Sequence, residues 1–308
     1  MNALRYLIWR NTKLFFKDRG MFFTALVTPL ILLLLFVTFL GDIYRDSFRS
    51  AIPAGLIVPE SLVEGFAGGW LFSSLLAVCC VTVAFCANML MVQDKATGTR
   101  ADLCITPVKK STLALGYYTA TALSTLVICG AALGACFLYL GGMGWYLSAA
   151  DVLLTCLDVF LLVMFGTALS SVVSHFLSTQ GQISAVGTIV SACYGFLCGA
   201  YMPISQFSEG IRTFISFLPG TYGTVLLHRH LMRGVLGELE GSYIPPQAVE
   251  GIRDAFDCNL YFLGNKVEPA MMYLILGGTV AVLIAAYVLL TMADENARVK
   301  ARPHAKQA

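Results

Sequence analysis

The sequence predicts an all-α membrane protein with six transmembrane helices, and three observations support that prediction. Apolar residues make up 57% of the 308 residues and charged residues only 12%. Together with a mean hydropathy of +0.76, this composition lies well outside that of ordinary soluble domains. Six apolar runs are long enough to cross a hydrocarbon core of about 30 Å. Basic residues also gather in alternate segments between those runs, as the positive-inside rule requires.

The first 19 residues predict an amphipathic helix that lies on the membrane surface. Leu4, Leu7 and Leu14 share one helical face, whereas Arg10 and Lys13 lie largely on others. The apolar run that follows is too long for the core of a signal peptide and lacks a convincing cleavage site. We therefore interpret residues 21–40 as a retained first span.

The other five spans are expected over residues 70–92, 112–140, 152–176, 182–202 and 271–292. The polar segment 41–69 follows the first span, the charged loop 93–110 follows the second, and a tail over 293–308 follows the last. The external segment 203–270 is expected to hold a short helix pair in the outer leaflet, because Glu209, Arg212 and Pro219 prevent a crossing of the hydrocarbon. From Val235 to Lys266 this segment is expected to be loop-like. All these parts form one transmembrane domain.

The distribution of basic residues predicts the orientation. If six spans alternate, thirteen basic residues fall on the side of the termini and seven fall on the opposite side, together with eleven acidic residues. The positive-inside rule then places both termini in the cytosol of a protein of the cell membrane.

Several classes of function are disfavoured by the motifs that we do not find. The sequence contains no Walker phosphate loop, no dinucleotide fingerprint, no zinc-protease motif and no nucleophile elbow. We therefore expect neither catalytic residues nor a cofactor bound by this chain. His228 and His230 are two positions apart and point to different helix faces, so no metal site is expected. The nearly balanced net charge of +2 argues against a nucleic-acid partner.

One carboxylate lies within an apolar run. Asp158 is one heptad from Asp151, so the two project from a similar helix face, and a charge there must face inward or find a partner. It is either a substrate-facing or proton-linked group, or a hydrogen-bonded packing residue, or a group hydrated near the outer interface. We favour the packing interpretation.

The charged loop 93–110 carries a spaced motif, and a second motif follows the fifth span. Gly98, Thr99, Leu103, Thr106 and Pro107 are spaced as in the membrane subunits of type-2 ABC exporters. The second set, which resembles the signature of that family after its fifth span, comprises Gly199, Pro203, Pro219 and Tyr222. Six spans and the amphipathic start extend the resemblance over nearly the whole chain. Ala96, Arg100 and Ser208 depart from residues that are common in the family.

The resemblance implies a permease subunit that is driven by separate cytosolic ABC ATPase subunits, which bind ATP and Mg²⁺. The segment 94–107 would be the coupling helix that seats in the ATPase, with Asp94, Lys95, Arg100 and Asp102 as candidate contacts. The helix over 1–19 would be the connecting helix on the cytosolic surface. A second copy or a related permease would complete the membrane part as a homo- or heterodimer.

In this family the second and fifth spans commonly line the translocation cavity. The candidates here are Phe72, Phe85, Asn88, Tyr194 and Phe196, with Asp158 in the fourth span. The resemblance implies export of an apolar or amphipathic molecule such as a drug, antibiotic, peptide, lipid or glycan. The main alternative is an ATP-independent channel or secondary transporter, which would require rings of charge or broken-helix repeats in the spans. A membrane-embedded enzyme or receptor-like scaffold is a further alternative, although we find no set of polar catalytic groups at one depth.

Overall fold

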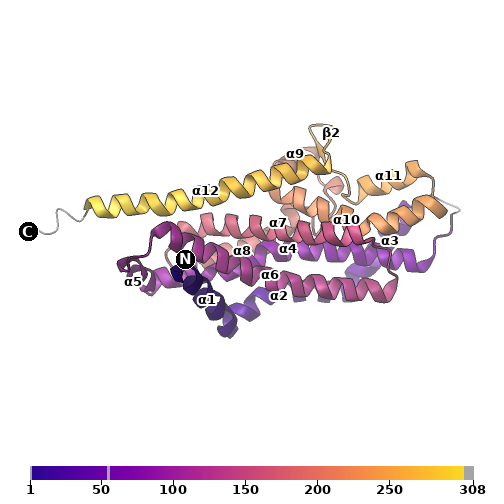
Figure 1. Cartoon of the computed structure of the whole chain (residues 1–308). Coiled ribbons are helices and arrows are strands. Elements are labelled where there is room, and N and C mark those ends of the chain that lie inside the picture. The colour runs from indigo at the N-terminus through magenta and orange to yellow at the C-terminus, as the bar shows by residue number, and fades with distance from the viewer. Residues whose placement is uncertain (1, 54–55, 302–308) are drawn as a thin grey trace, which may run out of the picture.

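The computed structural model describes residues 2–53 and 56–301, and most of them are helical. The long helices run lengthwise in one bundle (Figure 1). Helices α1 and α5 and the end of α12 lie towards one end of the bundle, and α3 and α11 lie towards the other. The expected all-α membrane fold is confirmed, and the first group of elements marks the end that we expect to be cytosolic.

The amino-terminal helices bend sharply at Asp18. Helix α1 (Asn2–Lys17) meets α2 (Arg19–Leu35) at an angle of 72°. The Asp18 carboxylate accepts a hydrogen bond from the amide of Met21 at 3.1 Å and so caps the start of α2. Helix α2 continues through the π-helical turn η1 (Phe36–Leu40) into α3 (Gly41–Ala51). Residues 41–51 of the segment expected to be polar therefore form a helical extension of α2.

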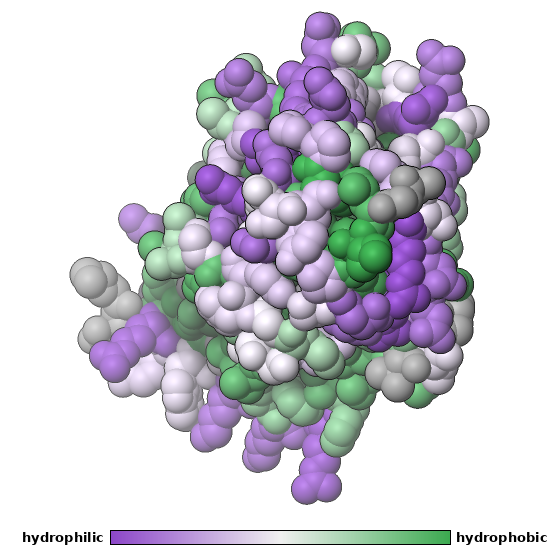
Figure 2. Space-filling model, turned by 90° about the vertical axis from the view of Figure 1, so that its right-hand side faces the viewer, coloured by the Kyte–Doolittle hydropathy of each residue, from purple (hydrophilic) through white to green (hydrophobic). Residues whose placement is uncertain are grey.

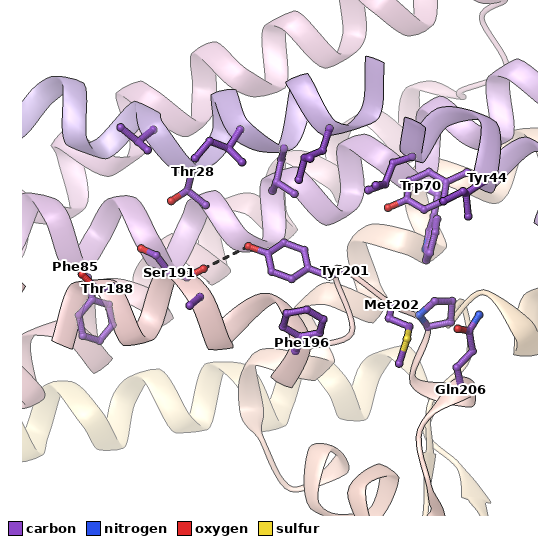
Figure 3. A pocket seen from close by; sticks show the side chains of 18 of the residues that line it. Thr28, Tyr44, Trp70, Phe85, Thr188, Ser191, Phe196, Tyr201, Met202 and Gln206 are labelled. Carbon is purple, nitrogen blue, oxygen red and sulfur yellow. Dashed lines mark hydrogen bonds between the residues drawn. The ribbon is translucent and has the colours of Figure 1, made fainter. Parts of the chain in front are cut away.

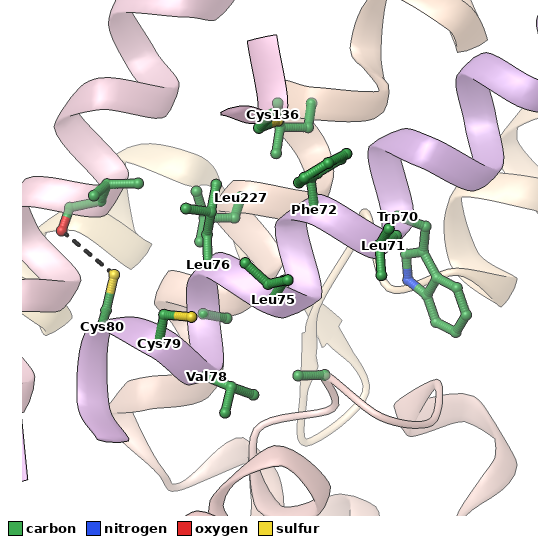
Figure 4. Packing of buried hydrophobic residues seen from close by; sticks show 14 of the residues in the cluster. Trp70, Leu71, Phe72, Leu75, Leu76, Val78, Cys79, Cys80, Cys136 and Leu227 are labelled. Carbon is green, nitrogen blue, oxygen red and sulfur yellow. Dashed lines mark hydrogen bonds between the residues drawn. The ribbon is translucent and has the colours of Figure 1, made fainter. Parts of the chain in front are cut away.

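Helix α4 (Glu60–Ala96) is the central element of the bundle. It is 37 residues long, almost wholly buried, and packed against α2, α6, α7, α8 and α10. Figure 4 shows Phe72, Leu76 and Leu227 within this packing. The helix begins at Glu60, directly after Pro59 and before the expected span at residue 70, and two ion pairs join its first turns to α3. Arg45 contacts Glu64 at 2.7 Å, and Arg49 contacts Glu60 at 2.6 Å.

The next four helices are α5 (Thr99–Ile105), α6 (Lys110–Met143), α7 (Ala149–His175) and α8 (Gln180–Leu197). Ser148 forms a capping box at the start of α7, and Thr179 forms another at the start of α8. Helix α8 ends before residue 202, where its span was expected to end, because Gly199 adopts a left-handed conformation with φ of 78°.

The outer segment is more helical than expected. It contains η2 (Ile204–Gln206), α9 (Glu209–Ser216), α10 (Pro219–Ser242) and α11 (Pro246–Ala255). The short strands β1 (Tyr261–Phe262) and β2 (Asn265–Lys266) pair antiparallel before α12 (Pro269–Ala301). The prediction of a loop from Val235 to Lys266 is wrong for much of that length, because α10 continues to Ser242 and α11 follows. Residues 302–308 of the expected tail lie outside the described residues.

Among the described residues, four helices are long and apolar enough to cross a membrane: α4, α6, α7 and the part of α12 up to Ala293. The bent pair α1 and α2 would give a fifth if it counted as one span. Helix α8 does not meet this criterion by itself.

Helices α4 and α7 touch through a glycine. A Cβ atom added at Gly166 would lie 2.6 Å from the carbonyl oxygen of Cys80 and 2.9 Å from Cα of Val81. Because both are backbone atoms, α7 would have to move away from α4 to admit a side chain.

We predict that Gly166→Ala lowers the stability of the bundle by about 1–3 kcal/mol, the usual cost of overpacking a core. The matched control is Gly134→Ala in α6, where a Cβ would meet nothing within 4 Å. That change is expected to be neutral or to stabilise by up to about 1 kcal/mol, since alanine favours helix. Thermal unfolding in detergent measures both, and equal melting temperatures for the two variants would contradict the close contact.

Candidate functional site

The charged loop after α4 folds as a tight turn followed by the short helix α5. Gly98 adopts a left-handed conformation with φ of 83° and precedes the helix. This conformation favours glycine and turns the chain between α4 and α5. At the other end the Thr106 hydroxyl donates to the carbonyl of Leu103 at 2.6 Å, just before Pro107. The spaced residues of the motif thus delimit one structural unit, which spans Gly98 to Pro107.

Asp94 fastens this unit to the amino-terminal helix. The two nitrogens of the Arg10 guanidinium donate to its carboxylate at 2.7 and 3.1 Å, and the Tyr117 hydroxyl donates to it at 2.6 Å. The Asp94 side chain is only 8% exposed, so its carboxylate is engaged by residues of this chain. A bidentate pair at a partly buried position is among the stronger ion pairs that proteins form. It joins α1, the end of α4 and the start of α6.

Lys95 fastens the same unit to the end of α7. Its ammonium group donates to the carbonyls of Ser174, His175 and Leu177 at 2.9, 2.6 and 3.1 Å. These carbonyls lie where a helix leaves its last acceptors without intrahelical partners, and a cation there is favoured by the helix dipole. Asp94 and Lys95 therefore position the turn that precedes α5, while the following residues supply its exposed surface.

Helix α5 presents its outer face to solvent. Asp102 and Pro107 are exposed, Thr99 and Arg100 are half-buried, and the Ile105 side chain is 81% exposed. Leu103, in contrast, packs against a cluster of buried residues that includes Leu7 and Leu113. An exposed isoleucine on a short helix held from behind by a leucine is an arrangement suited to a protein contact.

A cavity of about 1090 Å³ lies between two walls of the bundle. Helices α2 and α3 form one wall, and α4 and α8 form the other. We call residues 201–206 the outer strap, and all of them except Ile204 line the cavity, together with Ala255 and Phe256. In Figure 3 Thr28 lies across the cavity from Thr188, while Tyr44 and Trp70 lie at one end. Its volume is slightly above the range of about 300–1,000 Å³ that is usual for drug-sized ligand sites.

None of the residues that line this cavity is an acid, a base or a histidine. Its polar groups are mostly hydroxyls, from Thr24 and Thr28 on α2 and from Ser184, Thr188 and Ser191 on α8. Thr24 and Thr188 donate to carbonyls of their own helices at 2.7 and 2.9 Å. Such a lining favours uncharged, mainly apolar molecules, because a charge would be desolvated there without a counter-ion.

Two of the six candidate cavity residues line this cavity, namely Phe85 and Phe196. The other four lie elsewhere. Phe72 packs against Tyr139 of α6, with ring centroids 5.3 Å apart. Asn88 donates to the hydroxyls of Ser170 and Ser171 on α7 at 3.2 and 3.3 Å.

Tyr194 and Asp158 are the remaining two. The buried Tyr194 hydroxyl lies 2.5 Å from where a Cβ would stand on Gly220. Asp158 is hydrogen-bonded between α7, α10 and α12, with no exposed surface. Neither residue is among those that line the cavity.

Sequence reasoning missed the wall formed by α2 and α3. The signal was present in the spacing of hydroxyls within apolar runs, since Thr24 and Thr28 are four residues apart, as are Ser184 and Thr188. Residues at this spacing share one helix face.

The second motif shapes the outer strap. A Cβ on Gly199 would lie 2.7 Å from Cγ1 of Ile204, so only glycine allows the close turn. Pro203 directly precedes η2, Pro219 occupies the first turn of α10, and the Tyr222 hydroxyl donates to the carbonyl of Ser216 at 2.8 Å. These four residues define the turns that lead from α8 into α10.

The strap is fixed to the outer end of the molecule by Asp257. Its carboxyl accepts the amide N–H of Ile204 at 2.6 Å, and the Ser205 hydroxyl donates to the carbonyl of Ala255 at 3.1 Å. Burial raises the pKa of Asp257 to about 8, although the amides of Ile204 and Ser205 oppose the shift. Hydrophilic residues gather over much of this end of the molecule, around a smaller hydrophobic patch (Figure 2).

The family model for ABC-2 family transporter proteins matches residues 56–287, from the segment before α4 into α12. The chain belongs to the ABC-2 transporter family. Members are membrane subunits of ABC transporters, and their ATPase is a separate component, so the family implies association with one. A comparison with curated protein sequences gave no match. In this ABC-2 permease the matched region contains both motifs and two of the four helices of the cavity walls, α4 and α8, while α2 and α3 lie before it.

We predict that the outer strap loses stability as the pH rises. The folded state holds the Asp257 proton up to about pH 8, whereas the unfolded chain releases it near pH 4. The contribution of this carboxyl to the free energy of unfolding is therefore complete below about pH 4. It is lost between about pH 4 and 8, and its total is on the order of a few kcal/mol.

Thermal unfolding of wild type and Asp257→Asn in detergent, followed from pH 5 to 9, measures this effect. The amide keeps the acceptor for Ile204 but cannot titrate, so the variant should show a much flatter dependence on pH. Equal slopes for the two proteins would show that Asp257 does not titrate as inferred.

Proposed function

We propose that the chain is the permease subunit of an ATP-driven exporter in the cell membrane, with both termini in the cytosol. In this proposal α2 and α8 join α4, α6, α7 and α12 as the six spans. Neighbouring subunits would cover the exposed sides of α2 and α8. A second copy or a related permease and two ATPase subunits complete the transporter. The observation that carries the proposal is the exposed α5, which is fastened from behind by Asp94 and Lys95.

The fastening suits the transmission of force. A short helix that hung on a flexible loop would absorb a displacement, whereas α5 is joined to α1 through Arg10 and to α7 through the Lys95 cap. A push on Ile105 is therefore transmitted to α1, α4 and α7 together. Elements that are packed and joined in this way move together, so a small displacement at one site can be converted into a larger movement elsewhere.

The charge-free cavity supports an apolar or amphipathic substrate. Its long axis follows α2 and α8, and Thr24 to Leu40 alone correspond to about 24 Å of helix, most of the hydrocarbon thickness. A channel for ions would require rings of charge or polar carbonyls along such a path. The lining residues provide no such charge, so the exporter is the function that we favour.

We predict that Ile105→Asp abolishes recovery of ATPase activity with the tagged permease when it is purified from membranes that contain its partner ATPase. A buried charge without a counter-ion typically costs several kcal/mol at a contact. The matched control is Ile57→Asp, since Ile57 is 90% exposed in the segment before α4, at the opposite end of the bundle.

Both variants should insert and migrate as wild type on size exclusion, because neither side chain is buried. Removal of residues 98–107 should have the same effect as Ile105→Asp. If the ATPase were still recovered with that deletion variant, the coupling role of α5 would be wrong.

A further inference from the structure

Helix α10 carries two ionisable side chains that are buried in the bundle and that point to different neighbouring helices. His228 and His230 are at most 4% exposed, and both lie within the stretch that packs against α4, α7 and α12. Burying such groups is unfavourable unless each finds a partner. The pairing of these side chains therefore identifies the helices to which α10 is bound.

Each of these groups has a partner on a different helix. Nδ1 of His230 lies 2.6 Å from Oδ2 of Asp158 on α7, and the Tyr273 hydroxyl of α12 donates to Oδ1 of the same carboxylate at 2.6 Å. Nε2 of His228 lies 3.2 Å from the Ser74 hydroxyl of α4. Asp158 thus joins three helices, with both carboxylate oxygens occupied.

A second pair lies nearer the outer end of the same two helices. Arg233 contacts the Asp151 carboxylate at 3.4 Å, one heptad before Asp158 on α7. Because both acids face α10, the pairs set the register between α7 and α10. A shift of α10 along α7 would leave Asp158 buried without its partner, which is strongly unfavourable.

The cavity wall formed by α8 is bound quite differently. Only Ile183 and Gly195 are buried on α8, and its polar residues Ser184 and Thr188 are exposed. Helices α8 and α10 are separated in sequence by the short elements η2 and α9. Buried polar pairs hold α10, whereas α8 is not held in this way. The segment from Cys198 to Leu218, which includes the outer strap, connects them.

We propose that Asp158 is a positioning residue that anchors α10 through His230 and Tyr273 to a fixed core of α4, α7, α10 and α12. The segment 198–218 connects this core to α8, of which only Ile183 and Gly195 are buried. The anchoring concerns the permease chain itself, and only its use in transport rests on the proposed function.

Hydrogen exchange, measured by mass spectrometry on the full chain in lipid nanodiscs, tests the anchor without the ATPase or a substrate. In the wild type, the amides of residues 221–236 should exchange as slowly as those of α4. Asp158→Asn should speed exchange in α10 by about a hundredfold or more, the change expected when one partner of a buried pair is removed. Amides of α6 should keep their wild-type rates.

Two further variants separate anchoring from general damage. Asp158→Asn combined with His230→Gln leaves no buried charge unpaired, so its effect should be smaller than the product of the two single effects. The control Asp46→Asn removes an acid whose side chain is 75% exposed and should change nothing in α10. The proposal is overturned if α10 of wild type exchanges as fast as α9. It is equally overturned if Asp158→Asn leaves α10 unchanged or raises exchange equally in every helix.

Discussion

The requirement that charges in a bilayer be paired explains most of the architecture of this permease. A charge in hydrocarbon is energetically costly, so charged side chains are found there only where a partner interacts with them. At the end of the bundle that carries α5, Arg10, Asp94 and Tyr117 satisfy one another, and deeper in the bundle Asp158, His230 and Tyr273 do the same. Both junctions join three elements. They connect helices that apolar packing alone would leave free to slide, because lipid tails compete equally well for apolar faces.

The same requirement explains why the cavity is free of charge. The charged groups within the bundle are turned towards helix junctions, which leaves α2 and α8 to meet the cavity with hydroxyls, glycines and apolar side chains. Hydroxyls can donate within their own helices, so a wall of this kind remains stable when the cavity is empty or filled. The permease thus separates the residues that hold its core from those that face the cavity.

The two motifs and the apolar runs predicted the membrane fold and the family, because they depend on local geometry. Gly98 must adopt a positive φ, and Gly199 must admit Ile204, so their identity is visible without tertiary information. Partners distant in sequence could not be predicted. The same loop contains Asp94 and Ile105, and only the structure shows that the first is buried against Arg10 while the second is exposed.

Tertiary packing also made the segment 203–270 more helical than its polar composition predicted. A loop was expected from Val235 onwards, yet α10 continues to Ser242. Its polar side chains meet Ser74, Asp158 and Asp151 on the neighbouring helices. Asp158 itself was expected to be hydrogen-bonded, but its partners His230 and Tyr273 lie 72 and 115 residues away in sequence. No local pattern identifies such partners.

We expect the charge-free space between α2 and α8 to bind uncharged apolar molecules. The most direct test is the dissociation constant of a neutral lipophilic fluorophore, such as Nile red, for the purified permease. Gly187 lines the cavity, and a Cβ added there would meet nothing within 4 Å, so Gly187→Trp fills the space without a clash at its base. The account predicts binding at least about tenfold weaker for that variant, a change of about 1.4 kcal/mol. It predicts unchanged binding for Leu138→Trp, where the side chain is 82% exposed on α6. Equal binding by wild type and both variants would contradict it.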